Sequence, residues 1–215
     1  MDFLLQALQL FQKGGPVMYL LLACSVIVVA IAVERHIYYR NMTAGGTDFI
    51  GKLRSLLERQ RVTEAVQLCE QMPTAVSRVA EEGLQAYQRG GNMENALEAA
   101  AMLTAAHLRE YFNYLSVIVT LAPLFGLLGT VIGMINSFSV FNIQAGQPMA
   151  ITGGVGEALV ATAAGLSVAA LALIVHTYFA HRLDRAVTDM EQVSALVIGA
   201  LSVKKITRRE AHEIA

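Results

Sequence analysis

The sequence predicts an all-α membrane protein with three transmembrane helices and long cytoplasmic helical extensions. Of its 215 residues, 55% are hydrophobic and only 15% are charged, a balance typical of membrane proteins rather than of soluble domains. Three apolar stretches are long enough to cross about 30 Å of hydrocarbon as helices. They cover residues 17–33, 114–141 and 155–179. The net charge of −1 gives no indication of nucleic-acid binding.

The N-terminal segment predicts two elements. Apolar side chains recur at helical spacing ahead of the sequence Gly-Gly-Pro; they are Phe3, Leu4, Leu8 and Phe11. This pattern predicts an amphipathic helix over residues 1–15 that lies on the membrane surface. A frayed hydrophobic tail is the alternative. Transmembrane helix 1 is predicted over residues 16–34, and charged and aromatic residues from Glu34 to Arg40 are expected to form a collar at the inner leaflet.

Residues 35–112 are predicted to form a cytoplasmic helical region. Apolar residues at three- and four-residue steps predict one or two amphipathic helices over residues 48–71, ended by Pro73, and another over 74–88. The turn sequence RGGN follows at 89–92. From Met93 the chain has no Gly or Pro until Pro123, so a continuous helix from residue 94 to 141 is expected to join the cytoplasm to the membrane.

No nucleotide-binding loop and no metal-ligand spacing is found in this region of the sequence, which argues against an enzyme and against a metal or organic cofactor. Cys24 lies in the first predicted span and Cys69 in the cytoplasmic region. The two environments differ, so both cysteines are interpreted as packing residues rather than as a disulfide.

The remaining chain predicts transmembrane helix 2 over residues 113–141, a periplasmic loop over 142–154, transmembrane helix 3 over 155–181, and a cytoplasmic C-terminal helix over 182–215. An apolar stripe in the last helix is expected to pack on the 48–88 segment or on another subunit. Its members are Leu183, Val187, Met190, Val193 or Ser194, and Val197.

The distribution of positive charge predicts the orientation. Of the 16 Lys and Arg residues, nine lie between Arg35 and Arg109 and six between Arg182 and Arg209, while residues 142–154 have none. By the positive-inside rule, the middle segment and the C-terminus are cytoplasmic. The N-terminus and the 142–154 loop are then periplasmic, and the simplest location is a bacterial cytoplasmic (inner) membrane.

Glu157 is the only charged side chain between Asn113 and Phe179. An acid in a membrane span is usually paired, hydrated, protonated or facing a cavity, because burying its charge costs free energy. Near the outer end of its span, Glu157 has an ordinary alternative role as an N-terminal helix cap at the interface.

Small residues and two threonines accompany Glu157 on the second and third spans. The small residues are Gly126, Gly129, Gly133, Ala158, Ala161 and Gly165, and they predict close helix packing or a pore lining. Counting helix rise from the 142–154 loop places Thr130 and Thr162 nearly level. Their hydroxyl groups suit a hydrated path, although each is equally expected to bond back to its own helix. Pro123 removes one backbone hydrogen bond and predicts a bend.

Two segments in this order, APLFGLLGTVIGMINSF (122–138) and GGVGEALVATAAGLSVA (153–169), resemble the core of the ExbB/TolQ proton-channel proteins, which are relatives of MotA. The similarity is concentrated in residues 115–185, and the three-span layout matches along the chain. Two departures stand out. Residues 169–172 read AALA where the family often has AIPA, so a straighter third helix is expected, and Ile132 stands where a Trp is frequent.

The resemblance implies a homo-pentameric ring whose second and third spans line a pore. It also implies that the pore encloses an ExbD/TolR-type single-span partner, as a dimer whose helices carry a membrane aspartate, with a TonB/TolA-type protein as a further partner. Carried over by motif, Glu157 matches the family glutamate, and Thr130 and Thr162 match the threonines of the proton route. The single glutamate and the three spans favour the ExbB/TolQ branch.

The expected function is therefore a proton-channel stator subunit that converts proton-motive force into work, either for TonB-dependent transport or for envelope maintenance. Protons are the transported ion, and the lipid bilayer is the surrounding medium. The alternative is a non-conducting helical membrane scaffold in which the small residues pack helices and Glu157 is a cap.

Overall fold

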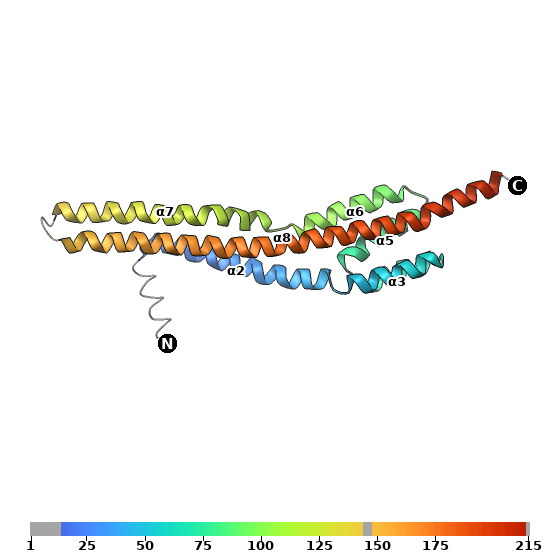
Figure 1. Ribbon diagram of the computed structural model, residues 1–215, viewed down its shortest axis with the longest axis horizontal. Helices are drawn as coiled ribbons and strands as arrows, with labels where there is room; N and C mark the ends of the chain where they lie inside the picture. Colours follow the sequence, from blue (N-terminus) through green and yellow to red (C-terminus); the bar gives the residue numbers. More distant parts are fainter. Residues whose placement is uncertain (1–13, 144–147, 214–215) are drawn as a thin grey trace. The chain divides into compact units, whose positions relative to one another are not determined.

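The computed structural model describes residues 14–143 and 148–213, and every regular element in these ranges is a helix (Figure 1). The helices are α2 (Val17–Met42), α3 (Gly46–Glu58), α4 (Val62–Gln71), α5 (Ala75–Gln88), α6 (Met93–Leu108), α7 (Phe112–Ile143) and α8 (Pro148–Glu213). The all-α prediction is confirmed for these residues. The predicted amphipathic helix lies outside them except for its last two positions, which form a turn.

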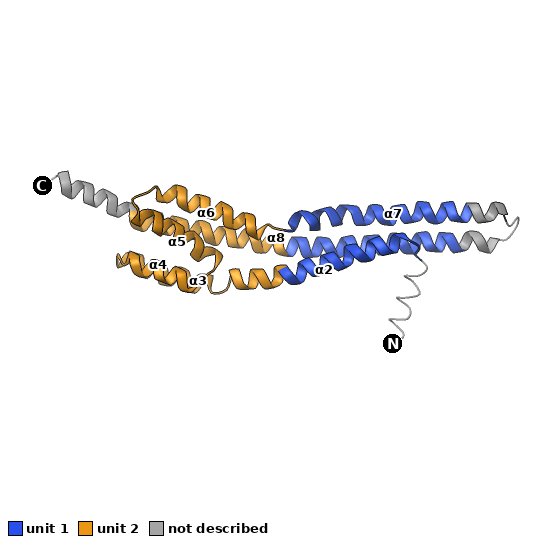
Figure 2. Ribbon diagram, turned by 180° about the vertical axis from the view of Figure 1, so that it is seen from behind, with its two compact units in different colours: residues 1–34, 111–178 blue, residues 35–110, 179–215 orange. Residues whose placement is uncertain are grey.

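The chain divides into two compact units (Figure 2). The apolar unit comprises Met1–Glu34 and Tyr111–Tyr178, and the polar unit comprises Arg35–Glu110 and Phe179–Ala215. Three stretches among the described residues have the length and hydropathy of a membrane span: Val17–Met42, Met93–Phe138 and Gly153–Leu201. The second of them contains α6 and most of α7. The prediction of a membrane protein with three spans is therefore confirmed.

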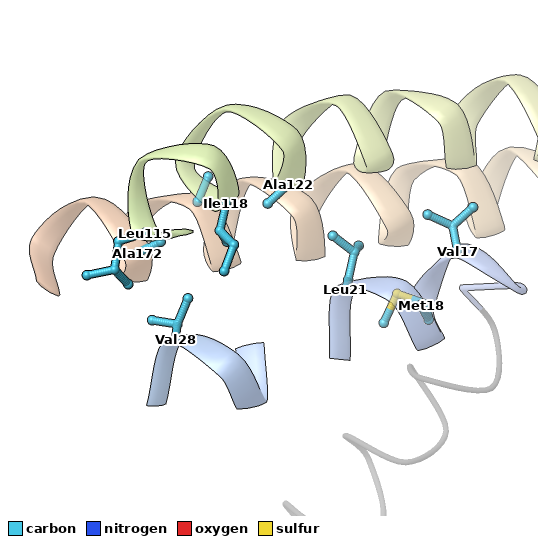
Figure 3. Packing of buried hydrophobic residues seen from close by; sticks show 9 residues of the cluster. Val17, Met18, Leu21, Val28, Leu115, Ile118, Ala122 and Ala172 are labelled. Atoms are coloured by element: carbon cyan, nitrogen blue, oxygen red, sulfur yellow. The ribbon is translucent and has the colours of Figure 1, made fainter. Parts of the chain in front are cut away.

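The core of the apolar unit is built from α2, α7 and the first part of α8. Figure 3 shows side chains of the three helices directed toward one another. Large side chains of α2 and α7, such as Leu21 and Leu115, pack against small ones, of which Ala122 and Ala172 are fully buried. Apolar residues outside this core remain exposed on all three helices, as expected for helices surrounded by lipid or by other membrane helices.

In the polar unit, consecutive helices pack on one another from α3 to α6. Side-chain caps explain where two of these helices begin. Thr74 and Ser77 form a reciprocal capping box at the start of α5, and Asn92 accepts a hydrogen bond from the Asn95 N–H at the start of α6. The predicted helices of this region match α3, α4 and α5 closely.

The C-terminal part of α8 contributes an apolar stripe to the polar unit. The buried side chains recur at three- and four-residue steps: Leu183, Ala186, Met190, Val193 and Val197. The prediction differs at one position, because Ala186 is buried while Val187 is only partly so. Arg54 and Leu57 of α3 line a pocket together with Gln192 and Leu196 of α8, so these two helices lie side by side.

A continuous helix over residues 94–141 was predicted, and this prediction is wrong. The chain ends α6 at Leu108, makes a turn and begins α7 at Phe112. Tyr111 has φ = 68°, a left-handed conformation that a helix cannot contain. The break contains no Gly or Pro. The end of α6 is instead stabilised by side chains of α2, which donate hydrogen bonds to its last carbonyl groups from far away in the sequence.

Two residues of the predicted collar are buried in the polar unit. Arg35 donates to the carbonyl oxygen of His107, and the Tyr39 hydroxyl donates to that of Leu108 at 2.9 Å. The side chains of both residues are at most 2% exposed. Arg35 also lies 4.7 Å from the centre of the Tyr38 ring, and the Tyr39 ring packs on Phe179.

The segment between α7 and α8 is shorter than predicted. A loop was expected over residues 142–154, but α7 continues to Ile143 and α8 begins at Pro148. Proline suits the first turn of a helix, because the N–H that it lacks has no partner there. Residues 144–147 lie outside the described ranges.

Candidate functional site

Small residues form the contact between α7 and α8, which we call the α7–α8 seam. A Cβ atom placed on Gly126 would lie 3.2 Å from the Ala161 carbonyl oxygen, and one on Gly165 would lie 2.6 Å from that of Ala122. A Cβ atom on Gly129 would overlap the Ala161 Cβ atom. The backbones of the two helices therefore approach closely along the seam.

The seam continues toward the C-terminal end of α7 and the N-terminal end of α8. A Cβ atom on Gly133 would lie 2.9 Å from the Gly154 carbonyl oxygen and 3.3 Å from the Ala158 Cβ. Ser137 is buried there, donates to the Gly133 carbonyl oxygen at 2.9 Å, and fills the space beside Gly154. The six small residues predicted from the sequence all lie in the seam.

Thr162 lies at the edge of the seam and is half-buried. Its hydroxyl oxygen is 3.3 Å from the carbonyl oxygen of Ala158 in its own helix and 3.4 Å from that of Gly126 in α7. A strong hydroxyl hydrogen bond is about 2.7–2.8 Å long. Because both distances are longer, the Thr162 hydroxyl is held by two weak interactions and retains capacity to bind water.

Thr130 behaves differently. Its hydroxyl donates to the Leu127 carbonyl oxygen of its own helix at 2.6 Å, a strong local bond of the kind that membrane threonines commonly make. The seam contacts pair Gly129 with Ala161 and Gly133 with Ala158. This register puts Thr130 about two residues, or about 3 Å, nearer than Thr162 to the end of the seam at Gly133 and Gly154. Both hydroxyl groups donate to carbonyl oxygens of α7, and that of Thr162 also donates to one of α8.

Glu157 is partly buried, and its carboxyl group lies against the turn that precedes α2. A Cβ atom placed on Gly15 would overlap the Glu157 Oε1 atom and lie 3.0 Å from its Cδ atom. The next turn of α8 touches the same segment, since a Cβ atom on Gly14 would lie 3.3 Å from Val160 Cγ1. Glu157 therefore faces α2 rather than α7.

The three candidate residues do not form one cluster within a single chain. Glu157 and Thr162 are five residues apart in sequence, which separates their directions by about 140° around a helix of 3.6 residues per turn. Glu157 points to the N-terminal turn, Thr162 lies at the seam, and Thr130 is bonded back to α7. Carboxyl and hydroxyl groups in this arrangement can exchange protons only through water or through groups supplied by other chains.

Other predicted features are placed as follows. Pro123 lies inside α7, which continues through it, and it is partly buried. Cys24 and Cys69 are both free thiols and lie in different units. Within the described ranges no group of three or more metal-ligating side chains lies together.

Sequence reasoning missed Gly15 and Ser137. The sequence Gly-Gly-Pro indicated only a turn, and nothing in it marked Gly15 as the contact of a glutamate more than 140 positions away. Ser137 was part of the motif segment 122–138 without a role of its own. A polar residue four positions after Gly133 on the same helix face was the available signal.

Comparison with known proteins identifies the family of this chain. The model of the MotA/TolQ/ExbB proton channel family matches residues 71–192, more than half of the chain, and this range contains the whole seam and all three candidate residues. The chain belongs to the MotA/TolQ/ExbB proton channel family. This family is one of channels rather than of enzymes, as the sequence predicted.

Relatives named ExbB place the chain in the ExbB/TolQ branch of the MotA/TolQ/ExbB family. A putative biopolymer transport protein ExbB homolog of Methanothermobacter thermautotrophicus is 27% identical over 96% of this chain and 74% of its own length. A putative ExbB-like protein 1 of Synechocystis is 34% identical over 77% and 67%. The biopolymer transport protein ExbB of Neisseria meningitidis is 31% identical over 78% and 84%.

Proposed function

We propose that the protein is a proton-conducting stator subunit of an inner-membrane motor, in which Glu157 and Thr162 lie on the proton route. The observation that carries this proposal is the weakly held Thr162 hydroxyl, at 3.3 and 3.4 Å from its two carbonyl oxygens, on the same helix as Glu157, the only acid of the second and third predicted spans. A hydroxyl with spare hydrogen-bonding capacity in an apolar seam is suited to holding a water molecule.

The geometry supports an assembly rather than a monomer. Because Glu157 and Thr162 point about 140° apart around α8, one chain does not line a continuous route. In a ring of several copies, water and groups of the neighbouring chains complete such a route, and a homo-pentamer is the arrangement that the family resemblance implies.

The same reasoning supports a partner. Beyond Glu157 the second and third spans offer hydroxyl groups and no second acid, so a proton conducted between them needs a titratable group from another protein. An ExbD/TolR-type helix with a membrane aspartate fits this need, and a TonB/TolA-type protein is the proposed recipient of the work. One proton crossing 100 mV supplies about 2.3 kcal/mol, enough to bias a conformational step.

The proposed orientation has the N-terminus periplasmic and the C-terminus cytoplasmic. It rests on the absence of Lys and Arg from residues 142–154 and on their abundance in residues 35–109 and 182–209. The names of the relatives support a role in biopolymer transport, which corresponds to the ExbB-like alternative for the downstream system, beside TolQ-like envelope maintenance.

One observation favours a second function, that of a non-conducting helical scaffold. Thr130 is committed to its own helix, and the small residues fill the seam without leaving space for water at Gly129 and Gly133. In that case Glu157 serves only to fix the N-terminal turn, and the chain assembles without conducting.

Proton flux separates the two functions. The chain is purified together with its single-span partner, reconstituted into liposomes containing a pH-sensitive dye, and energised with a potassium diffusion potential. We expect Glu157→Gln to abolish flux while assembly, measured by native mass spectrometry, is unchanged. Glu98→Gln, on an exposed position of α6, is the control. Full flux in the Glu157→Gln assembly rejects the channel and leaves the scaffold.

A further inference from the structure

The turn that precedes α2 contains two glycines, and the second of them touches Glu157. Gly15 has φ = 70°, in the left-handed region, and its carbonyl oxygen accepts a hydrogen bond from the Met18 N–H at 3.2 Å as α2 begins. Pro16 follows and fixes the entry to the helix. The turn is thus a defined structure held by backbone geometry.

Glu157 occupies the space that a side chain of residue 15 would take. A Cβ atom on Gly15 would overlap Oε1 and lie 3.0 Å from Cδ and 3.5 Å from Cγ of Glu157. Three consecutive atoms of the glutamate side chain therefore lie along the open face of the glycine. Any L-amino acid other than glycine at this position displaces the carboxyl group.

The turn is also fixed from its other side. The Cβ position of Gly14 is 3.3 Å from Val160 Cγ1, and Val17 is 3% exposed, with its Cβ atom 3.7 Å from the Cβ position of Gly129. Residues of both α7 and α8 thus hold the turn in place. A rigid surface that touches the carboxyl group limits the positions that the group can adopt.

From these contacts we propose that Gly15 is a positioning residue for Glu157. Because glycine has no side chain, the carboxyl group of Glu157 fits against residue 15, and contact with the turn then holds this group in one position. The inference rests on the proposed function, because it assigns Gly15 a part in proton conduction through Glu157. It adds that the turn that precedes α2 determines the position of the Glu157 carboxyl group.

The first test combines three variants in the liposome assay described above. Gly15→Ala is expected to lower proton flux about tenfold or more, because displacing a reacting group by about 1 Å costs up to a hundredfold. Glu157→Asp withdraws the carboxyl group by one methylene. In the double variant, the shorter aspartate at position 157 leaves room for the new methyl group at position 15, so flux is expected to rise above that of Gly15→Ala alone.

Gly90→Ala is the matched control for backbone strain. Gly90 has φ = 73°, almost the value of Gly15, and nothing lies within 4 Å of its Cβ position. Gly90→Ala is expected to leave flux unchanged. If Gly15→Ala prevents assembly, recovery of the assembly in the Gly15→Ala/Glu157→Asp double variant supports the proposal, and failure to recover overturns it.

A second readout needs no proton conduction. The hydrophobic reagent dicyclohexylcarbodiimide labels membrane carboxyl groups, and mass spectrometry follows labelling of Glu157 in the chain without its partner. Gly15→Ala is expected to accelerate labelling severalfold, because the carboxyl group is pushed off the turn. Unchanged labelling and unchanged flux in Gly15→Ala overturn this inference. Flux that survives Glu157→Gln overturns the proposed function and with it the part of Gly15 in conduction, and the labelling rates then decide whether Gly15 positions the carboxyl group.

Discussion

Arg35 donates a hydrogen bond to the carbonyl oxygen of His107, with 3.1 Å between nitrogen and oxygen, although 72 positions separate the two residues. The last carbonyl groups of a helix lack partners within the helix, and positive charge is favourable at that end. Arg35 supplies a hydrogen-bond donor and a positive charge at the end of α6. Its guanidinium group also lies 3.8 Å from the carboxylate of Glu110, two residues after the helix ends. The end of α6 is therefore fixed by a residue of α2.

Replacing Arg35 tests this cap. Arg35→Gln is expected to lower the free energy of unfolding of the polar unit by about 2–3 kcal/mol, because a hydrogen bond from a charged donor is lost in a buried place. Hydrogen exchange of the amides at residues 105–110 measures the loss locally. Arg40→Gln, on an exposed position of the same helix, serves as the control, and equal protection in the two variants contradicts the cap.

The Tyr39 hydroxyl makes a separate contribution. Tyr39→Phe keeps the ring contact with Phe179, whose centre is 5.5 Å away, and removes only the hydrogen bond to Leu108. We expect a loss of about 1 kcal/mol, the usual net value of a neutral hydrogen bond. Denaturant unfolding of Tyr39→Phe and Tyr38→Phe compares the two, and a larger loss in Tyr38→Phe argues against this assignment.

The glycines of the seam are expected to respond according to their contacts. In Gly165→Ala the new Cβ atom meets backbone atoms, the Ala122 carbonyl oxygen at 2.6 Å and the Gly126 Cα at 2.9 Å, and backbone atoms cannot rotate away. A destabilisation of about 1–3 kcal/mol is expected from this overpacking.

Gly156→Ala is the control for the seam, since nothing lies within 4 Å of its Cβ position on the same helix. It is expected to be neutral or to stabilise α8 by up to about 1 kcal/mol, because alanine has the higher helix propensity. Thermal unfolding in detergent measures both variants. Similar melting temperatures for the two mean that α7 and α8 do not approach as closely as described.

The two threonines are expected to differ in their effect on proton flux. Thr162→Val removes a hydroxyl that is weakly held and able to bind water, and flux is expected to fall about tenfold, the equivalent of one hydrogen bond of about 1.4 kcal/mol. Thr162→Ser keeps the hydroxyl and most of the flux. Thr130→Val is expected to have the smaller effect, because that hydroxyl is committed to Leu127; the reverse order contradicts the roles assigned here.

Cys69 gives the polar unit a dependence on alkaline pH. Burial, followed by the nearby Glu81 and Glu70 carboxylates, raises the pKa of this thiol from 9.0 to about 12. The unfolded chain loses the proton first, so the contribution to stability is complete below about pH 9 and is lost as pH rises toward about 12. Cys69→Ala is expected to flatten the decline in unfolding free energy over that range, and an unchanged decline contradicts the assignment.

The same burial of Cys69 predicts slow alkylation of its thiol at neutral pH. The thiolate is the reactive form, so alkylation of Cys69 in the folded protein is expected to be much slower than after unfolding in urea. Mass spectrometry of the peptide that contains Cys69 follows the reaction. Equal rates in folded and unfolded protein mean that the α4 position is open to solvent.

The sequence predicted those features that depend on local pattern. Hydropathy located the three spans, and the helical spacing of apolar residues located the helices of residues 48–88. The ends of α4 and α5 were recognisable from Pro73 and from the glycines of RGGN. The turn between α3 and α4 has neither Gly nor Pro, so one or two helices were predicted over residues 48–71. The small residues of the seam were recognisable since Gly and Ala at intervals of three and four residues permit close helix packing. The family motif placed Glu157, Thr130 and Thr162 on their helices.

Features that depend on distant contacts escaped prediction. The break between α6 and α7 has no glycine or proline, and the bonds that fix it come from Arg35 and Tyr39. A contact between Gly15 and Glu157 joins segments that share no local pattern. The sequence also predicted the same role for Thr130 and Thr162. Their hydrogen bonds differ because the two residues lie on different sides of their helices with respect to the seam.

The seam between α7 and α8 has a mechanical consequence. Glycine and alanine have no side-chain rotamers, so the pair cannot accommodate sliding by repacking, and each glycine-to-backbone contact acts as a fixed stop. We therefore expect the two helices to move as one stiff unit in any rearrangement of the protein. Changes in packing are then expected on the faces of α7 and α8 that lie away from the seam. Large exposed side chains there, such as Leu124 and Leu159, can change rotamer.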